Sequence, residues 1–354
     1  MKTLILILCA IGICFGAYAA TGTHAGVWTA ELQGDKLQIT IFHREHDTTE
    51  GAARRFDNQM GFDVRLAELT GTSSSELSSD AANVKFMLSR EAGSIAFDGR
   101  FSNGNGAGHF DFRPNDTFVH ALGTLGFTEF RHDELLIFAV NDLTMETVRG
   151  LQALGYHPTN HELVDIAIFN ITPEAVREYS RLGWENLPIR ELVELRIGHI
   201  DAAWVKAMRE LGFTGMTSKE ASNAGILGVS PAYVREMRAA GLEAASLHQL
   251  TDLRVGHITP KRIEEYAHAG YPHLTARELS ELGVQGVTPQ YIEELRAAGY
   301  DHLTVHQLVN AKIFGVTPDY IRKMNAAGYS GVPLEKLVQL RMAGMGDLVT
   351  KRGR

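Results

Sequence analysis

The sequence predicts a mixed α+β fold, in which a small N-terminal antiparallel β domain precedes an all-α solenoid of two-helix repeats. Eight times, a helix-capping residue is followed eleven positions later by a glycine, and successive glycines lie 29 residues apart, with one interval of 28. A fixed period of roughly 20–50 residues is the signature of stacked repeats. The pairs are Asn115/Gly126, Thr144/Gly155, Thr172/Gly183, Asp201/Gly212, Ser230/Gly241, Thr259/Gly270, Thr288/Gly299 and Thr317/Gly328.

Each pair encloses the second helix of a unit. In the copy that begins at Thr317, the threonine side chain can accept backbone N–H groups and Pro318 suits the first helical turn. Gly328 suits the left-handed residue that ends a helix. When the capping residue is counted as zero, position +4 is β-branched and position +7 is large and apolar in every copy, which places both on one helical face.

The first helix of each unit lies between a glycine and the next capping residue. Its apolar residues, such as Leu303, Leu308, Val309, Ile313 and Val316, are expected on the side that packs against neighbouring helices. The Asn115 copy has no first helix of its own, and a last first helix from Leu334 to Ala343 is expected to close the array. Capping boxes mark five of these helices, at Thr159/Glu162, Thr217/Glu220, Ser246/Gln249, Thr275/Glu278 and Thr304/Gln307.

The region before the repeats predicts strands. Residues 28–42 alternate between apolar and polar side chains around a turn at Gly34-Asp35, and further strands are expected at 84–88, 95–101 and 110–112. Asn103-Gly104-Asn105-Gly106 is a hairpin signal. Residues 43–83 are expected to be polar and irregular, with a short helix near Leu66 to Leu69. A small antiparallel sheet or half-barrel is the interpretation.

The first residues are typical of an export signal. Lys2 is followed by an apolar run of about a dozen residues and by Ala17-Tyr18-Ala19, and that run is too short for a bilayer, which needs about 20. Cys9 and Cys14 are the only cysteines, so the mature chain is expected to have none. The predicted organisation is a signal peptide (1–19), a β domain (20–113), a solenoid of about eight repeats (114–346) and a basic tail (347–354).

Charge argues against nucleic acid as a partner. The formal net charge is −8, and acidic and basic residues are interspersed outside the short tail. Nucleic-acid binding normally requires a basic stripe. The Gly-Val-Thr-Pro turn also resembles tandem helix-hairpin-helix units that grip DNA, but threonine or serine stands in most copies where those units carry a second glycine.

An aromatic residue recurs at position +3 of the second helix, and two interpretations remain open. These side chains either complete the packing between units or form a ladder along a concave surface that binds an extended partner, since solenoids use such surfaces and Tyr and Trp are favoured anchors. The aromatics that follow the glycines are expected to staple the turns. The candidate partner-binding residues are Phe118, Trp204, Tyr233, Tyr291 and Tyr320.

No catalytic constellation is visible. The chain has no Gly-x-Ser-x-Gly, no His-Glu-x-x-His and no cysteine beyond the signal, so no cofactor and no metal are expected. His199 and His257 occupy equivalent loop positions and are expected to be exposed. An exported metal-dependent hydrolase, with a site around His43, His46 and His109 where the β domain meets the repeats, is the competing hypothesis.

Two stretches resemble known proteins together. Gly286-Val287-Thr288-Pro289-Gln290-Tyr291-Ile292, continued by Leu295 to Tyr300, resembles a repeat of uncharacterised exported proteins of environmental bacteria. The same repeat is similar to the extracytoplasmic C-terminal part of beta-lactam-sensor-type membrane metallopeptidases, and Phe101 to Pro114 resembles the segment before it. The likeness covers most of residues 84–343. The chain lacks the peptidase part, so the resemblance implies the extracytoplasmic module without peptidase activity.

The leading hypothesis is therefore an exported bacterial protein, periplasmic or extracellular, that acts as a non-enzymatic scaffold. Its expected partner is a protein or peptide of the cell envelope, within sensing or regulation, and no integral membrane segment is expected after signal cleavage. A structural envelope spacer without a specific partner is a further alternative.

Overall fold

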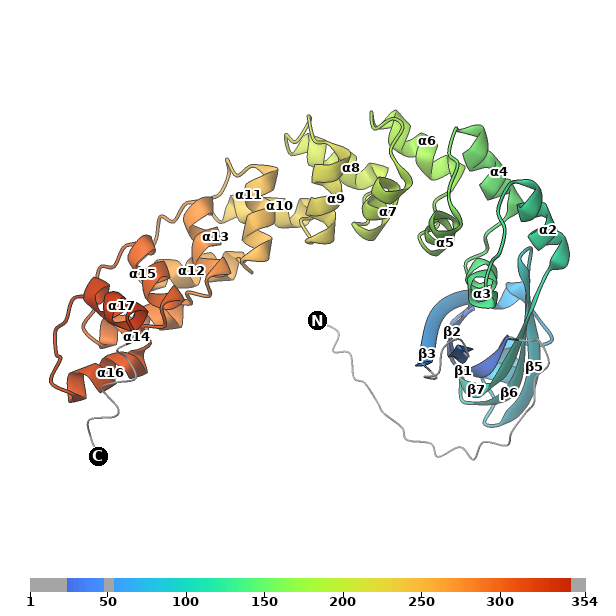
Figure 1. Cartoon of the computed structure of the whole chain (residues 1–354), viewed down its shortest axis with the longest axis horizontal. Helices are drawn as coiled ribbons and strands as arrows, with labels where there is room; N and C mark the ends of the chain where they lie inside the picture. Colours follow the sequence, from blue (N-terminus) through green and yellow to red (C-terminus); the bar gives the residue numbers. More distant parts are fainter. Residues whose placement is uncertain (1–23, 48–53, 345–354) are drawn as a thin grey trace. The chain divides into compact units, whose positions relative to one another are not determined.

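The computed structural model describes residues 24–47 and 54–344 of the chain (Figure 1). The predicted signal peptide and basic tail lie outside the described residues. The chain forms two compact units, Met1–Thr172 (unit 1) and Pro173–Arg354 (unit 2). The β region ends at Pro114 and the repeat helices begin at Asp116, so unit 1 contains the sheet together with the first repeat helices.

The described part of unit 1 contains a curled, fully antiparallel sheet of seven strands with the order β3-β2-β1-β7-β6-β5-β4 (Figure 1). A short helical turn, η1 (Leu66–Glu68), and a single turn of helix, α1 (Ser74–Leu77), connect its last strands. The mixed α+β class is confirmed. The strands are β1 (His24–Gln33), β2 (Lys36–Asp47), β3 (Arg54–Arg65), β4 (Leu69–Thr70), β5 (Ala82–Arg90), β6 (Gly93–Ser102) and β7 (Asn105–Pro114).

The alternation of apolar residues builds the core of the sheet. Leu37, Ile39 and Ile41 of β2 are fully buried on one face, as the two-residue period of a strand requires. The Trp28 ring packs against the Phe86 and Phe97 rings, with centroid distances of 5.5 and 5.9 Å. The predicted hairpin is present, because the residues at the β6–β7 turn, Asn103 and Gly104, have φ angles of 49° and 80°.

The expectation that residues 43–83 are irregular was wrong. Strand β2 continues to Asp47, and β3 pairs with it along its whole length, with Met60 opposite Ile41 and Val64 opposite Leu37. The alternating residues Met60, Phe62 and Val64 carried this signal, but polar residues on the other face obscured it. The short helix predicted near Leu66 is the turn η1.

The sheet is joined to the helices of unit 1 through the β5–β6 turn. Helix α2 directly follows β7, as expected for a copy without a first helix. The Glu91 side chain accepts a hydrogen bond from the backbone N–H of Met145 (3.1 Å) at the start of α4, and Arg90 pairs with Asp142 (3.4 Å). The helices of unit 1 are α2 (Asp116–Thr124), α3 (His132–Val140), α4 (Met145–Ala153) and α5 (Asn160–Ile168).

The described part of unit 2 is a series of nine-residue helices that alternate between the two predicted types. First-type helices are α7 (Ile189–Ile197), α9 (Ser218–Ile226), α11 (Leu247–Val255), α13 (Ala276–Val284), α15 (Val305–Ile313) and α17 (Leu334–Met342). Second-type helices are α6 (Pro173–Arg181), α8 (Ala202–Glu210), α10 (Pro231–Ala239), α12 (Pro260–His268), α14 (Pro289–Ala297) and α16 (Pro318–Ala326).

Local capping chemistry explains why every helix is so short. All five predicted capping boxes form, and in each of them the Ser or Thr hydroxyl accepts the N3 amide while the Glu or Gln accepts the N-cap amide. The glycine that ends each second-type helix is left-handed, with φ near 90°, as at Gly328. Helix α17 closes the described series without a second-type helix after it, as predicted.

Arginine side chains join successive second-type helices. The Nη2 atom of Arg238 donates to the carbonyl of Leu211 (2.6 Å), which lies at the end of the preceding second-type helix, and Arg209 contacts Leu182 in the same way (2.5 Å). Carbonyls at a helix C-terminus lack intrahelical partners and attract cations. Each of these repeats therefore caps the one before it.

Candidate functional site

The structure places four of the five predicted partner-binding aromatics in the core. Phe118, Tyr233, Tyr291 and Tyr320 are between 2 and 5 % exposed, and only Trp204 is partly exposed. A buried ring offers almost no area to a partner. The ladder interpretation therefore does not describe these four positions, and the packing interpretation does.

The buried tyrosines act as wedges between repeats. The Tyr233 hydroxyl donates to the carbonyl of Ile258 (3.2 Å) and the Tyr291 hydroxyl donates to that of Val316 (2.7 Å). Each carbonyl lies one residue before the N-cap of the next second-type helix. Burial raises the pKa of both phenols. The neutral hydroxyl is therefore kept as the donor, and it satisfies a backbone acceptor that would otherwise be buried without a partner.

A cation from the next first-type helix lies over each of these rings. The Arg254 Cζ atom is 3.8 Å from the centroid of Tyr233, and the Lys312 Nζ atom is 4.7 Å from that of Tyr291. These are cation–π distances. The tyrosine lies on a second-type helix and the cation on the first-type helix that follows it, and we call this contact the Tyr–cation interface.

Two other interfaces use glycine instead. Gly198 ends α7 against Gly225 of α9, and Gly256 ends α11 against Gly283 of α13. A Cβ atom on Gly225 or Gly283 would lie only 2.3 Å from the carbonyl oxygen of its partner glycine. The two backbones are in direct contact in this Gly–Gly interface, which no larger residue permits.

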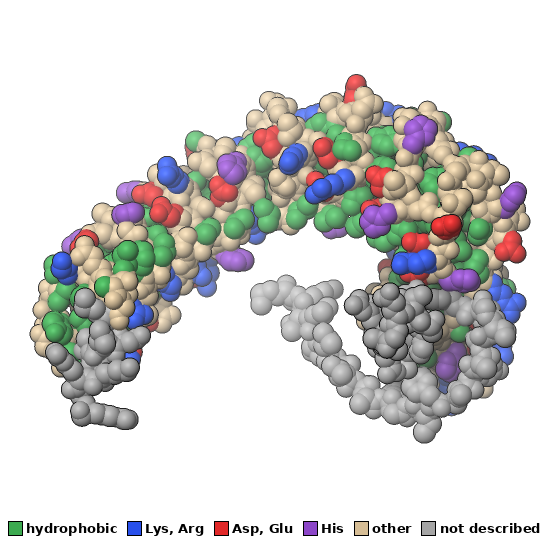
Figure 2. All heavy atoms as spheres, viewed as in Figure 1, with side chains coloured by type: hydrophobic (Ala, Val, Ile, Leu, Met, Phe, Trp, Pro, Cys, Tyr) green, Lys and Arg blue, Asp and Glu red, His purple; other side chains and the backbone are tan. Residues whose placement is uncertain are grey.

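Six exposed apolar side chains form a row that the sequence analysis missed. They are the ninth residue of each first-type helix in unit 2, they recur every 29 residues, and they are 44 to 63 % exposed. Figure 2 shows apolar side chains reaching the surface along the series of helices. This aliphatic row consists of Ile197, Ile226, Val255, Val284, Ile313 and Met342, and Ile168 is its counterpart in unit 1.

Two polar rows accompany the aliphatic row on the same helical face, at the sixth and second residues of each helix. The three positions follow the i, i+4, i+7 spacing of one stripe, and we call the whole the first-helix face. The acceptor row consists of Glu194, Asn223, Asp252, Glu281, Asn310 and Gln339. The basic row consists of Arg190, Lys219, His248, Arg277 and His306, with Glu335 in the last helix.

Contacts between the basic and acceptor rows fix their order on the surface. Arg190 pairs with Glu194 (Nε to Oε1, 3.1 Å), and His306 Nε2 lies 2.9 Å from Asn310 Nδ2. The acceptor row therefore lies between the basic row and the aliphatic row.

One sequence interpretation is corrected by this row. Ile313 was expected on the packed side of its helix, yet it is 53 % exposed. It lies five residues after the buried Leu308, which turns it about 140° around the helix from the core direction. The 29-residue recurrence of an aliphatic residue at the last helical position was the available signal.

The predicted histidines whose side chains the structure describes form no assembled site. His199 and His257 are exposed and have φ angles of 53° and 54°, so they occupy the left-handed position that Gly228 fills in another copy. His109 is partly exposed on β7, whereas the side chains of His43 and His46 lie outside the described residues. Within the described residues, no group of three or more His, Cys, Asp or Glu side chains could hold a metal ion.

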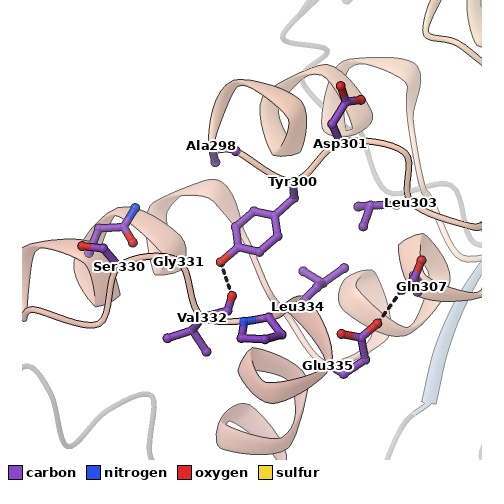
Figure 3. A pocket seen from close by; sticks show the side chains of 13 residues that line it. Ala298, Tyr300, Asp301, Leu303, Gln307, Ser330, Gly331, Val332, Leu334 and Glu335 are labelled. Atoms are coloured by element: carbon purple, nitrogen blue, oxygen red, sulfur yellow. Dashed lines mark hydrogen bonds between the residues drawn. The ribbon is translucent and has the colours of Figure 1, made fainter.

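A cavity of about 480 Å³ lies between the last repeats (Figure 3). The Tyr300 side chain lines this cavity, and its hydroxyl donates to the carbonyl of Val332 (2.7 Å). Gln307 donates to the Glu335 carboxylate. Trp184 and Tyr271 make the equivalent contact elsewhere in the array, where each donates to a carbonyl 32 residues later in the chain. The cavity is thus a seam between repeats whose polar side chains already serve that seam.

Comparisons with protein-family models, with curated proteins and with solved structures give no match. No helix within the described ranges is long and apolar enough to cross a membrane. The fold and the surface define a class of protein, an antiparallel sheet followed by a helical-repeat solenoid with a periodic exposed face.

Proposed function

We propose that this protein is an exported scaffold that binds a protein or peptide partner of the cell envelope through the first-helix face. The observation that carries the proposal is the aliphatic row. Six large aliphatic side chains stay about half exposed at one repeated position, although burial is their usual state. Contiguous exposed apolar surface is typical of interaction sites, and solenoids bind along such repeated surfaces.

The internal packing of the repeats does not require the row. The Gly–Gly interfaces already join neighbouring first-type helices, and the Tyr–cation interfaces join a second-type helix to the first-type helix after it. The arginine caps join the second-type helices. Side chains that pack little against their own chain and recur in every copy of unit 2 are therefore available to a partner. The competing hydrolase hypothesis receives no supporting observation from the described residues.

The test is a comparison of two triple variants in affinity capture from an envelope extract of the host. Ile226→Ser, Val255→Ser and Val284→Ser remove the centre of the aliphatic row. Ala203→Ser, Ala232→Ser and Ala297→Ser change exposed positions on second-type helices and serve as the matched control. Both variants should fold, because substitutions of exposed residues usually change stability by less than about 0.5 kcal/mol each.

We expect one enriched partner to be lost with the first variant and retained with the control. Equal capture by both variants would refute the assignment of this face. A chain that captures nothing specific would support the spacer alternative instead.

A further inference from the structure

We infer that two copies of this chain pair along the free edges of their β3 strands, so that the two sheets continue into each other. The pairing is antiparallel, and its two-fold axis passes through Gly61. The sheet belongs to unit 1 and the aliphatic row of six residues to unit 2, so this inference is independent of the proposed function.

Strand β3 leaves one edge of the sheet unpaired. It stands first in the order β3-β2-β1-β7-β6-β5-β4, and only β2 pairs with it among the described residues (Figure 1). The opposite edge is blunted, because β4 has only two residues and α1 packs beside β5 and β6. A free edge presents backbone N–H and C=O groups that can pair with another strand.

Three devices that commonly protect an edge strand are missing from residues 59–65 of β3. These devices are a proline, a bulge and a charged side chain that points inward. The stretch contains no proline, and it pairs with β2 residue for residue, without a bulge. Its two charged residues, Asp63 and Arg65, lie on the outer face, because they alternate with the residues that face the core.

The apolar face of the sheet is incomplete at this edge. Met60 and Phe62 pair with Ile41 and Ile39, which are fully buried, and therefore share their face. Nevertheless both Met60 and Phe62 are partly exposed, whereas Val64 of the same strand is only 3 % exposed. An added strand with apolar residues at alternate positions would cover the exposed parts of both side chains.

Gly61, between these two residues, is not required by packing within the sheet. A Cβ atom on Gly61 would lie 3.7 Å from Oγ1 of Thr40, which is ordinary contact, whereas one on Gly108 of β7 would lie 2.0 Å from a carbonyl oxygen. Glycine weakens the interior of a strand, and it often marks a place where another backbone approaches closely. Gly61 therefore indicates a second backbone at this edge.

A second copy of β3 supplies the complementary strand. When Gly61 faces Gly61, Met60 of one copy lies opposite Phe62 of the other, and Gln59 lies opposite Asp63. The two-fold axis repeats each pair, so the two apolar pairs cover the incomplete face on both copies. No two like charges face each other between residues 59 and 63. Because β3 ends at Arg65, the overlap extends over residues 57–65 of each strand.

The experiment uses the chain from residue 20 onward, which contains no cysteine. Sedimentation equilibrium between about 1 and 100 µM is expected to show a reversible transition between monomer and dimer, because one pair of strands makes a small interface.

Disulfide trapping locates the axis. Gly61→Cys places two thiols opposite each other, where Cα atoms about 4.5–5.5 Å apart allow a disulfide to form. Asp63→Cys is the matched control on the same face of the same strand, because its two copies would lie four residues, or about 13 Å, apart along the strands. Mild oxidation should cross-link Gly61→Cys chains at least about ten-fold faster than Asp63→Cys chains.

Two substitutions of Gln59 test the same register without a cross-link. In Gln59→Lys the new ammonium group faces Asp63 of the second copy at two places, so the dimer should tighten, whereas Gln59→Glu should weaken it. Two cross-strand charge pairs change the dissociation constant by about two- to thirty-fold. Both variants alter an exposed side chain, so circular dichroism should show the same fold.

A chain that stays monomeric at every concentration would overturn the inference and leave this edge to a strand of another protein. Equal trapping of the two cysteine variants, or a dissociation constant that ignores residue 59, would place the contact on another surface or in another register and would also overturn it. The capture experiment tests the proposed function separately, whichever of these results is obtained.

Discussion

Replacing Gly283 with alanine should push α11 and α13 apart and destabilise unit 2. The new Cβ atom would lie 2.3 Å from the carbonyl oxygen of Gly256 and 2.9 Å from its Cα, and both are backbone atoms. Ordinary contact begins at 3.4 Å, so the two helices must separate by about 1 Å. A backbone carbonyl cannot rotate away as a flexible side chain can, because it is fixed by its peptide plane.

Two opposing terms determine the magnitude. Overpacking costs about 1–3 kcal/mol, whereas alanine in place of glycine within a helix contributes about 1 kcal/mol of stability. Gly123 in α2 provides the matched control, since its Cβ would meet nothing within 4 Å. Gly123→Ala should stabilise its helix by about 0.5–1 kcal/mol, so the difference between the two variants isolates the clash at about 1–3 kcal/mol.

The measurement is urea denaturation followed by circular dichroism, together with native-state hydrogen exchange of the α13 amides. Hydrogen exchange is needed because repeat arrays unfold locally and need not follow a two-state transition. Faster exchange in α11 and α13 is expected for Gly283→Ala alone. If Gly283→Ala stabilises as much as Gly123→Ala, the Gly–Gly interface does not have the close contact described above.

Three further predictions concern the wedges, the caps and the left-handed residues. Tyr291→Phe removes the bond to the Val316 carbonyl and should cost about 1 kcal/mol, whereas Tyr320→Phe should be nearly neutral, because the Tyr320 hydroxyl has no partner among the described residues; thermal denaturation compares them. The backbone N–H and hydroxyl of Thr275 lower the pKa of Glu278 below its ordinary 4.5. The Glu278 carboxylate therefore stabilises the folded chain fully above pH 4.5, and this stabilisation is lost as the pH falls through the lowered pKa. Glu278→Gln should remove that acid dependence and keep the cap, and identical acid titrations of stability would contradict this. His199→Gly should stabilise unit 2 by up to about 1 kcal/mol, because a left-handed backbone strains a residue with a Cβ; unchanged urea midpoints would show that the strain is absent.

Features that depend on local chemistry could be predicted from the sequence. The capping boxes, the glycine at the end of each second-type helix and the hairpin at Asn103-Gly104 are encoded within a few residues. The strand β3 was missed because its pairing with β2 stabilises a segment whose outer side chains are polar. Sheet pairing is a tertiary effect, and tertiary context overrides local composition.

The surface could not be predicted in the same way. Tyr291 and Ile313 are both apolar and both recur with the period of the repeat, so periodicity alone ranks them equally. The next repeat covers Tyr291 and leaves Ile313 about half exposed, at 53 %. That difference depends on how neighbouring first-type helices approach one another. Two pairs of first-type helices meet through Gly–Gly contact, whereas at other junctions a cation of the first-type helix covers a tyrosine of the second-type helix before it.

This alternation limits how the chain can gain or lose repeats. From α7 to α13 the glycine contact, the tyrosine contact and the glycine contact follow in turn. Deleting one copy of this stretch would place the glycine at the end of one helix against the arginine of another. Deleting the neighbouring copy would instead place a bulky helix end against a glycine and leave a void. Deleting two consecutive copies restores matching neighbours. Beyond α13 the alternation ends, because Tyr291 with Lys312 and Tyr320 with Arg341 are two tyrosine–cation contacts in succession. From α7 to α13 the array can therefore change length by pairs of repeats, whereas from α13 to α17 the loss of a single copy leaves matching neighbours.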